Sequence, residues 1–107
     1  MEKECIFCDI AHGKAPCDLL FENERIVVFK DIKPHCPTHL LIVPKKHIRS
    51  VNDLAEEDSG LLAELFYVAK EMAEKVGVDK KGYKLLFNVE KGGGQVIFHL
   101  HLHLLAK

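Results

Sequence analysis

The segment His99-Leu100-His101-Leu102-His103-Leu104-Leu105, close to the last residue of the sequence, is the most informative part of this chain. Histidines alternate with leucines in it, and alternate side chains of a β-strand share one face. The spacing therefore predicts a strand over 98–105 with His99, His101 and His103 side by side. The leucines between them then point into a hydrophobic core, so that one strand supplies both a site and part of the core.

Length and composition restrict the class of protein. The chain has 107 residues, of which 48% are hydrophobic, and this predicts one compact domain over 1–107. The net charge is −1 and basic residues do not cluster, which argues against binding of duplex nucleic acid but is compatible with a small anionic ligand. No apolar run reaches the ~18 residues of a membrane span, and residues 1–5 lack the pattern of a signal peptide. We therefore expect a cytoplasmic protein without membrane contact.

Hydrophobic patterns predict the remaining elements. We expect a short helix over 6–12 that ends at Gly13, a hairpin of strands 19–22 and 26–30, and strands over 39–43 and 83–88. A long helix over 55–76 is indicated by apolar residues at intervals of three and four, namely Leu61, Leu65, Val68, Ala69, Met72 and Val76. Five strands and one long helix predict an α+β fold with a five-stranded antiparallel sheet.

The histidine cluster favours a functional site. A single histidine is more often a satisfied polar residue at the edge of a core, but three on one face are not explained by packing. Two chemistries fit such a strand: metal binding, and covalent catalysis in which an imidazole attacks phosphorus. The loop Gly92-Gly93-Gly94 allows backbone N–H groups to approach a phosphate, although a glycine triplet is also typical of a flexible connection.

The cysteines suggest a second site. Cys5 and Cys8 form a C-x2-C pair, which in a cytosolic protein indicates either zinc or a redox dithiol. The redox interpretation is the weaker, because no strand precedes the pair. Zinc needs two more ligands, and histidines are available. Cys17 and Cys36 lie in no such motif.

The residues quoted above resemble a known family. The segment 93–105 is similar to the signature of the histidine triad (HIT) family, His-φ-His-φ-His-φ-φ, where φ is hydrophobic. The resemblance continues upstream through 29–34 and 37–47 and is strongest to the Hint-like nucleoside phosphoramidases. It implies the HIT fold and a homodimer whose protomers extend one sheet.

The resemblance also implies roles for individual residues. His101 is expected to attack the α-phosphate of a purine nucleotide, such as an AMP or GMP derivative, and to form a nucleotidyl-histidine that water hydrolyses. His103 and His39 are expected to contact the phosphate or the leaving group, and Asp31 the ribose hydroxyls. The remaining nucleotide contacts implied are Asn88, Gly94, Gln95 and Val96 at the phosphate and Ile6, Phe29 and Ile32 at the base. Asp31 also suits a turn before Pro34, and the three apolar residues also suit a core.

A zinc-binding subset of the family implies the metal ligands. They correspond to Cys5, Cys8, His47 and His99, a closed set of two thiolates and two imidazoles for a structural ion. No catalytic metal is required by the mechanism.

One departure from the family pattern concerns turnover. Val96 stands where the family usually carries a Ser or Thr hydroxyl, so we expect nucleotide binding to persist while turnover or leaving-group preference changes. The alternatives are therefore a nucleotide-binding regulatory protein with slow or no turnover, and a dinucleoside polyphosphate hydrolase.

Overall fold

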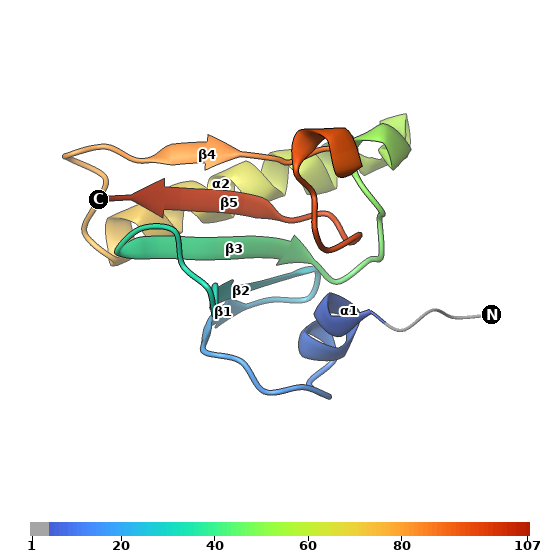
Figure 1. Cartoon of the computed structure of the whole chain (residues 1–107), viewed down its shortest axis with the longest axis horizontal. Coiled ribbons are helices and arrows are strands. Elements are labelled where there is room, and N and C mark those ends of the chain that lie inside the picture. The colour runs from blue at the N-terminus through green and yellow to red at the C-terminus, as the bar shows by residue number, and fades with distance from the viewer. Residues whose placement is uncertain (1–4) are drawn as a thin grey trace.

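The computed structural model describes residues 5–107, which form one five-stranded sheet, two α-helices and three short 3-10 helices (Figure 1). The strands are β1 (Leu19–Glu22), β2 (Ile26–Lys30), β3 (Thr38–Pro44), β4 (Lys84–Leu86) and β5 (Leu102–Ala106). The helices are α1 (Ile6–Ala11), α2 (Ser59–Lys75), η1 (Val51–Asp53), η2 (Glu56–Asp58) and η3 (Lys91–Gly93). Every strand pair is antiparallel, in the order β1-β2-β3-β5-β4. The predicted α+β architecture is confirmed.

The two faces of the sheet have different covers. On one face α2 packs on β3 and β5, and the core there includes Ile42, Leu65, Leu102 and Leu104, all with no exposed surface. On the other face the short helix α1 lies near the β2 and β3 end (Figure 1) and covers only part of the sheet. His39 and His103 belong to this second face, because alternate strand residues point the same way. The partly covered face therefore carries the histidines.

The predicted histidine strand is shorter than expected. β5 begins at Leu102, so that His99 and His101 precede it, whereas Leu100, Leu102 and Leu104 are buried as predicted. The pairing of β3 with β5 ends at Ile42↔Leu102. Two residues after Ile42, where β3 would next donate to this neighbour, stands Pro44, which has no N–H. The N–H of Leu100 instead donates to the carbonyl of Ile48 at 2.6 Å. The chain before Leu102 is thus held by the β3–α2 connection.

The long helix starts later than predicted, and its last predicted residue is the cap. Residues 56–58 form a 3-10 turn, and the Asp58 carboxylate accepts the N–H of Ala55 at 2.9 Å in this turn. At the other end Gly77 has φ +82 and stops the helix, as predicted. Val76 is 39% exposed, so its assignment to the buried face was wrong, because it lies at the cap beyond the last helical turn.

No helix among residues 5–107 has the length and apolarity to cross a membrane. The sequence expectation about a signal peptide concerns residues 1–5, of which 1–4 lie outside the described residues.

Candidate active site and metal centre

Two cysteines and two histidines meet at the junction of α1, the segment after β3 and the segment before β5. The four ligand atoms, the Sγ atoms of Cys5 and Cys8 and one ring nitrogen each of His47 and His99, lie within 4.8 Å of one another. Nδ1 of His99 is 3.3 Å from Cys5 Sγ, 3.4 Å from Cys8 Sγ and 3.1 Å from His47 Nδ1. Two thiolates and two imidazoles at such separations match the donor set of a tetrahedral zinc site. All four predicted ligands are brought together.

The hydrogen bond of His99 to the backbone prepares it for this role. Its Nε2 lies 2.8 Å from the carbonyl oxygen of Pro44, and because a carbonyl only accepts, Nε2 carries the proton. Nδ1 therefore presents its lone pair to the cysteines, in the arrangement that orients metal-bound histidines. Burial lowers the pKa of His99 to about 4, and the neighbouring imidazoles of His47 and His101 add to this. The ring stays neutral and able to ligate.

His101 is oriented in the opposite sense. Its Nδ1 donates to the carbonyl of His99 at 2.7 Å, so that its Nε2 holds the lone pair. The ring of Phe7 in α1 packs edge-on against that of His101, with centroids 5.0 Å apart and planes at 87°. Burial lowers the pKa of His101. An uncharged imidazole with a fixed tautomer and an unprotonated Nε2 is a nucleophile in its reactive form.

His39 and His103 are linked to each other by a hydrogen bond across β3 and β5. The backbone N–H of His35 donates to Nδ1 of His39 at 3.1 Å, which leaves the proton of a neutral His39 on Nε2. Nε2 of His39 lies 2.9 Å from Nδ1 of His103 and donates to it. His103 must then carry its own proton on Nε2. One backbone amide thus sets the tautomers of two imidazoles.

The resulting N–H of His103 donates no hydrogen bond within the described residues. Its Nε2 is buried and lacks a hydrogen-bond partner anywhere in residues 5–107. Burial, with smaller effects of His101 and His39, lowers the pKa of His103 to about 4, and burial likewise lowers that of His39. A buried polar group without a partner is costly and commonly marks a place where a ligand binds. A phosphate oxygen is an acceptor of the kind this donor needs.

Asp31 follows β2 and serves two contacts. Its Oδ1 accepts the N–H of Lys33 at 2.9 Å, which confirms the turn that the sequence suggested. Its Oδ2 lies 3.5 Å from Nε2 of His39. One carboxylate oxygen therefore stabilises the turn and the other faces the histidines.

The glycine loop is stabilised by hydrogen bonds between its own backbone groups. The N–H groups of Gly94 and Gln95 donate to the carbonyls of Lys91 and Glu90, both at 3.0 Å. Gly94 has φ +85, and a Cβ there would lie 3.5 Å from Nδ2 of Asn88, which itself donates to the Gly93 carbonyl. The backbone N–H of Val96, another predicted phosphate contact, bonds to no residue in 5–107.

The side chain of Gln95 is part of the scaffold. It is buried, accepts the N–H of Glu90 at 2.7 Å and donates to the carbonyls of Arg49 at 2.8 Å and Ile97 at 3.0 Å. Glu90 in turn accepts from Arg49 and from Ser50, and these bonds lower its pKa. The sequence did not indicate this network, because its members are far apart in the chain.

The three apolar residues predicted at a base pocket lie in different surroundings. Phe29 is 3% exposed and its ring packs against that of Phe7, with centroids 5.5 Å apart. Ile6 is 48% and Ile32 88% exposed. The two isoleucines are exposed, whereas Phe29 belongs to the small core that α1 forms with β2 and β3.

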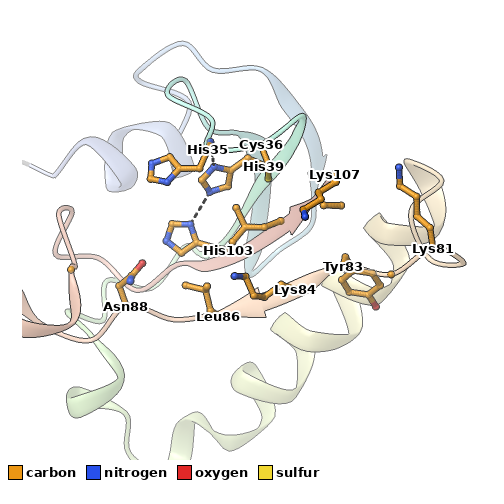
Figure 2. A pocket seen from close by; sticks show the side chains of 14 residues that line it. His35, Cys36, His39, Lys81, Tyr83, Lys84, Leu86, Asn88, His103 and Lys107 are labelled. Atoms are coloured by element: carbon orange, nitrogen blue, oxygen red, sulfur yellow. Dashed lines mark hydrogen bonds between the residues drawn. The ribbon is translucent and has the colours of Figure 1, made fainter.

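A cavity of about 750 Å³ opens on the histidine face, over β3, β5 and β4 (Figure 2). Of the predicted site residues it brings together His39, Asn88, Gly94 and His103. Its lining does not include His101, Asp31, Gln95, Val96 or the three apolar residues. The remaining lining residues were not predicted from the sequence: His35, Cys36, Lys81, Gly82, Tyr83, Lys84, Leu86, Leu105, Ala106 and Lys107.

Fold and site together define a small α+β protein in which His101, with an unprotonated Nε2, lies beside His103, whose Nε2 donor has no partner in residues 5–107. Residues 4–107 match the family model described as scavenger mRNA decapping enzyme C-term binding. The chain is 38% identical over 106 residues, 99% of its length, to the purine nucleoside phosphoramidase of Escherichia coli K12, of which it covers 89%.

Solved structures agree with this result. A HIT family hydrolase from Legionella pneumophila superposes with a TM-score of 0.95 at 50% identity, over 96% of this chain and 92% of that one. A zinc-bound histidine triad family protein from Mycobacterium smegmatis superposes with a TM-score of 0.82 at 30% identity, over 96% and 74%. The chain belongs to the histidine triad family.

Proposed function

We propose that this protein hydrolyses derivatives of purine nucleoside 5′-monophosphates, phosphoramidates in particular, through a nucleotidyl-histidine. The similarity to a purine nucleoside phosphoramidase supports the substrate class. The observation that carries the mechanism is the hydrogen bond from Nδ1 of His101 to the His99 carbonyl, because it leaves Nε2 unprotonated.

The reaction has two displacements. The Nε2 lone pair of His101 forms a bond to the α-phosphorus while the P–N bond of the substrate breaks, and the departing nitrogen keeps the bonding pair and takes up a proton from solvent. Water then attacks the phosphorus and gives a proton to solvent, the bond to His101 breaks and returns its electron pair to Nε2, and the nucleoside monophosphate is released. His103 donates its Nε2 proton in a hydrogen bond to a phosphate oxygen and stabilises the charge there. His39 holds His103 in the donating tautomer.

The nucleoside is proposed to lie over β2, on the α1 side of the histidines. Asp31 directly follows β2, and its Oδ2, beside His39, accepts well from two adjacent hydroxyl groups. Exposed Ile6 and Ile32, together with buried Phe29, supply apolar contact for a base. Asn88, Gly94, Gln95 and Val96 form or support the loop on the other side of the phosphate.

We also propose a structural zinc ion held by Cys5, Cys8, His47 and His99. The donor set, the compact cluster and the second hydrogen bond of His99 fit this ion. A bound zinc ion stabilises the attachment of α1 to the sheet. His99 then serves structure and leaves His101 and His103 for the reaction.

The test is the release of a fluorescent amine from an adenosine 5′-phosphoramidate. Wild-type protein should release it, and His101→Ala should not. His12→Ala is a matched control, because His12 is exposed and lies at the end of α1. Release that survives in His101→Ala would refute the assignment of the nucleophile.

A binding protein with slow turnover is the second candidate. It is favoured by Val96, which is 79% exposed and offers no hydroxyl to a leaving group. Tight AMP binding without measurable amine release supports this candidate over the first. A dinucleoside polyphosphate hydrolase is distinguished by comparing a phosphoramidate with a diadenosine polyphosphate.

A homodimer remains part of the proposal. Tyr67 of α2 is 68% and Phe66 40% exposed, and β4 is an edge strand of the sheet. An apolar helix face beside an open strand edge favours association of two copies. Sedimentation of wild-type protein and of Tyr67→Glu tests this state.

A further inference from the structure

Half of the cavity on the histidine face is not used by the proposed nucleotide contacts. This half is lined by residues of β4, of the end of β5, among them Leu105, and of the loop before β4. Figure 2 shows Lys81, Tyr83 and Lys84 there. The nucleoside is proposed to lie over β2, and in the sheet order β3 and β5 separate β2 from β4. A substrate with its phosphorus at the histidines therefore has its second half over β4.

The register of the sheet gives the distance to this half. Leu86 pairs with His103 and Lys84 pairs with Leu105, and paired residues share a face. Lys84 thus lies two residues further along the strands than the pair of Leu86 and His103, which corresponds to about 7 Å. A group three or four bonds beyond the scissile bond reaches this position.

The charge of this half is unbalanced. Of the fourteen residues that line the cavity, three are lysines and none is Asp or Glu. Lys81 and Lys84 form no ion pair with any residue in 5–107. Some other lysines are paired, as Lys45 is with Glu22 at 2.7 Å and Lys46 with Asp58 at 2.6 Å. Lysines without acidic neighbours in a concave surface attract an anionic group.

The cavity wall also has an apolar part. Leu86 pairs with His103 and Leu105 with Lys84, so both leucines lie on the histidine face, whereas the half-buried Tyr83 lines the cavity and packs against the core under α2. A short apolar linker therefore suits the space between the phosphorus and the anionic group.

We infer that this half of the cavity is a leaving-group subsite that selects a leaving amine carrying an anionic group, with Lys81 and Lys84 as its specificity-determining residues. The inference rests on the proposed function. It concerns the charge of the group that departs, whereas the reaction at phosphorus is unchanged. Carboxylate and phosphate-like groups share the chemistry that these lysines recognise.

The experiment uses three adenosine 5′-phosphoramidates of similar size. Their leaving amines are β-alanine, which carries a carboxylate, aminoethylphosphonate, which carries a phosphonate, and β-alaninamide, which is neutral. We expect kcat/KM of wild type to favour an anionic substrate over the amide by about fivefold or more, as two partly screened charges suggest. If the carboxylate substrate is preferred, the leaving group is of the amino-acid kind. If the phosphonate substrate is preferred, the leaving group is of the phosphorylated kind. The preference should decrease with added salt.

Variants test the assigned residues. In the double variant Lys81→Gln/Lys84→Gln the ratio of anionic to neutral kcat/KM should fall towards one. Lys80→Gln is the matched control, because Lys80 is the exposed neighbour of Lys81 and does not line the cavity. It should keep the wild-type ratio. Equal rates for all three substrates, or an unchanged ratio in the double variant, overturn the subsite.

A binding measurement separates this inference from the proposed function. If no substrate is turned over, or if His101→Ala keeps turnover, the proposed function fails. The affinities of the same three compounds for His101→Ala, by calorimetry, still test the subsite. Tighter binding of an anionic compound that is lost with Lys81→Gln/Lys84→Gln supports it, and equal affinities contradict it.

Discussion

Nε2 of His39 lies 2.9 Å from Nδ1 of His103, and the backbone N–H of His35 occupies the other nitrogen of His39 at 3.1 Å. This chain of two hydrogen bonds fixes both imidazoles in one tautomer. It also explains why the Nε2 proton of His103 is directed to a place without a partner among the described residues.

Replacing His39 by Phe should therefore lower kcat by about tenfold or more, because a misplaced donor stabilises the transition state less. KM should change little. Long-range 1H–15N spectra of wild type should show His103 protonated on Nε2, and the variant a mixture of tautomers. An unchanged spectrum together with unchanged kcat would show that His39 does not act on His103.

The lowered pKa of His103 predicts how stability depends on pH. The group has a pKa of about 4 when folded and the ordinary value of 6.5 when unfolded, so that between these pH values the unfolded chain binds more protons. The free energy of unfolding should then fall as pH drops from about 6.5 to about 4, and His103 contributes no further slope below that. Urea unfolding at several pH values measures it. His103→Gln should show a shallower fall, and equal slopes in both proteins would contradict the prediction.

Removal of zinc should loosen α1. Wild-type protein is expected to contain one zinc ion per chain, and Cys8→Ser or His47→Ala much less. The Tm should fall on the order of 10 °C, since ~1 kcal/mol shifts the Tm of a domain of this size by about 4–8 °C. Cys17→Ser is the control for metal content, because Cys17 is outside the cluster. Absence of zinc from wild type purified without chelator would refute the proposed site.

Val96→Thr tests the departure from the family pattern. The substitution returns a hydroxyl beside the phosphate loop at an exposed position, where folding tolerates it. We expect nucleotide affinity within about twofold of wild type and turnover several times faster, because a hydroxyl can donate to the departing group. Val96→Ala, which removes side-chain bulk without adding a hydroxyl, is the comparison. The same rate in wild type and Val96→Thr would show that this position does not limit turnover.

The sequence predicted those features that depend on a local repeat of apolar residues. The intervals from Leu61 to Met72 identified the buried face of α2, and the leucines between the histidines identified the core face of β5. The resemblance to the family correctly predicted that Cys5, Cys8, His47 and His99 form one cluster, although they are up to 94 residues apart in the sequence.

Features that depend on pairing between distant segments were not predicted. The late start of β5 follows from Pro44 and Ile48, and the structural role of Gln95 from Arg49 and Glu90. Lys84 lines the cavity beside Leu105 because β4 pairs with β5 in this register. Local patterns carry no information on such contacts.

The central claim, covalent catalysis by His101, is tested most directly by the stereochemistry at phosphorus. An adenosine 5′-phosphorothioamidate of known configuration is hydrolysed in water enriched in oxygen-18, and the configuration of the product is determined. Two successive in-line displacements, by His101 and then by water, predict overall retention. Inversion would mean one direct attack by water, and would contradict the nucleotidyl-histidine.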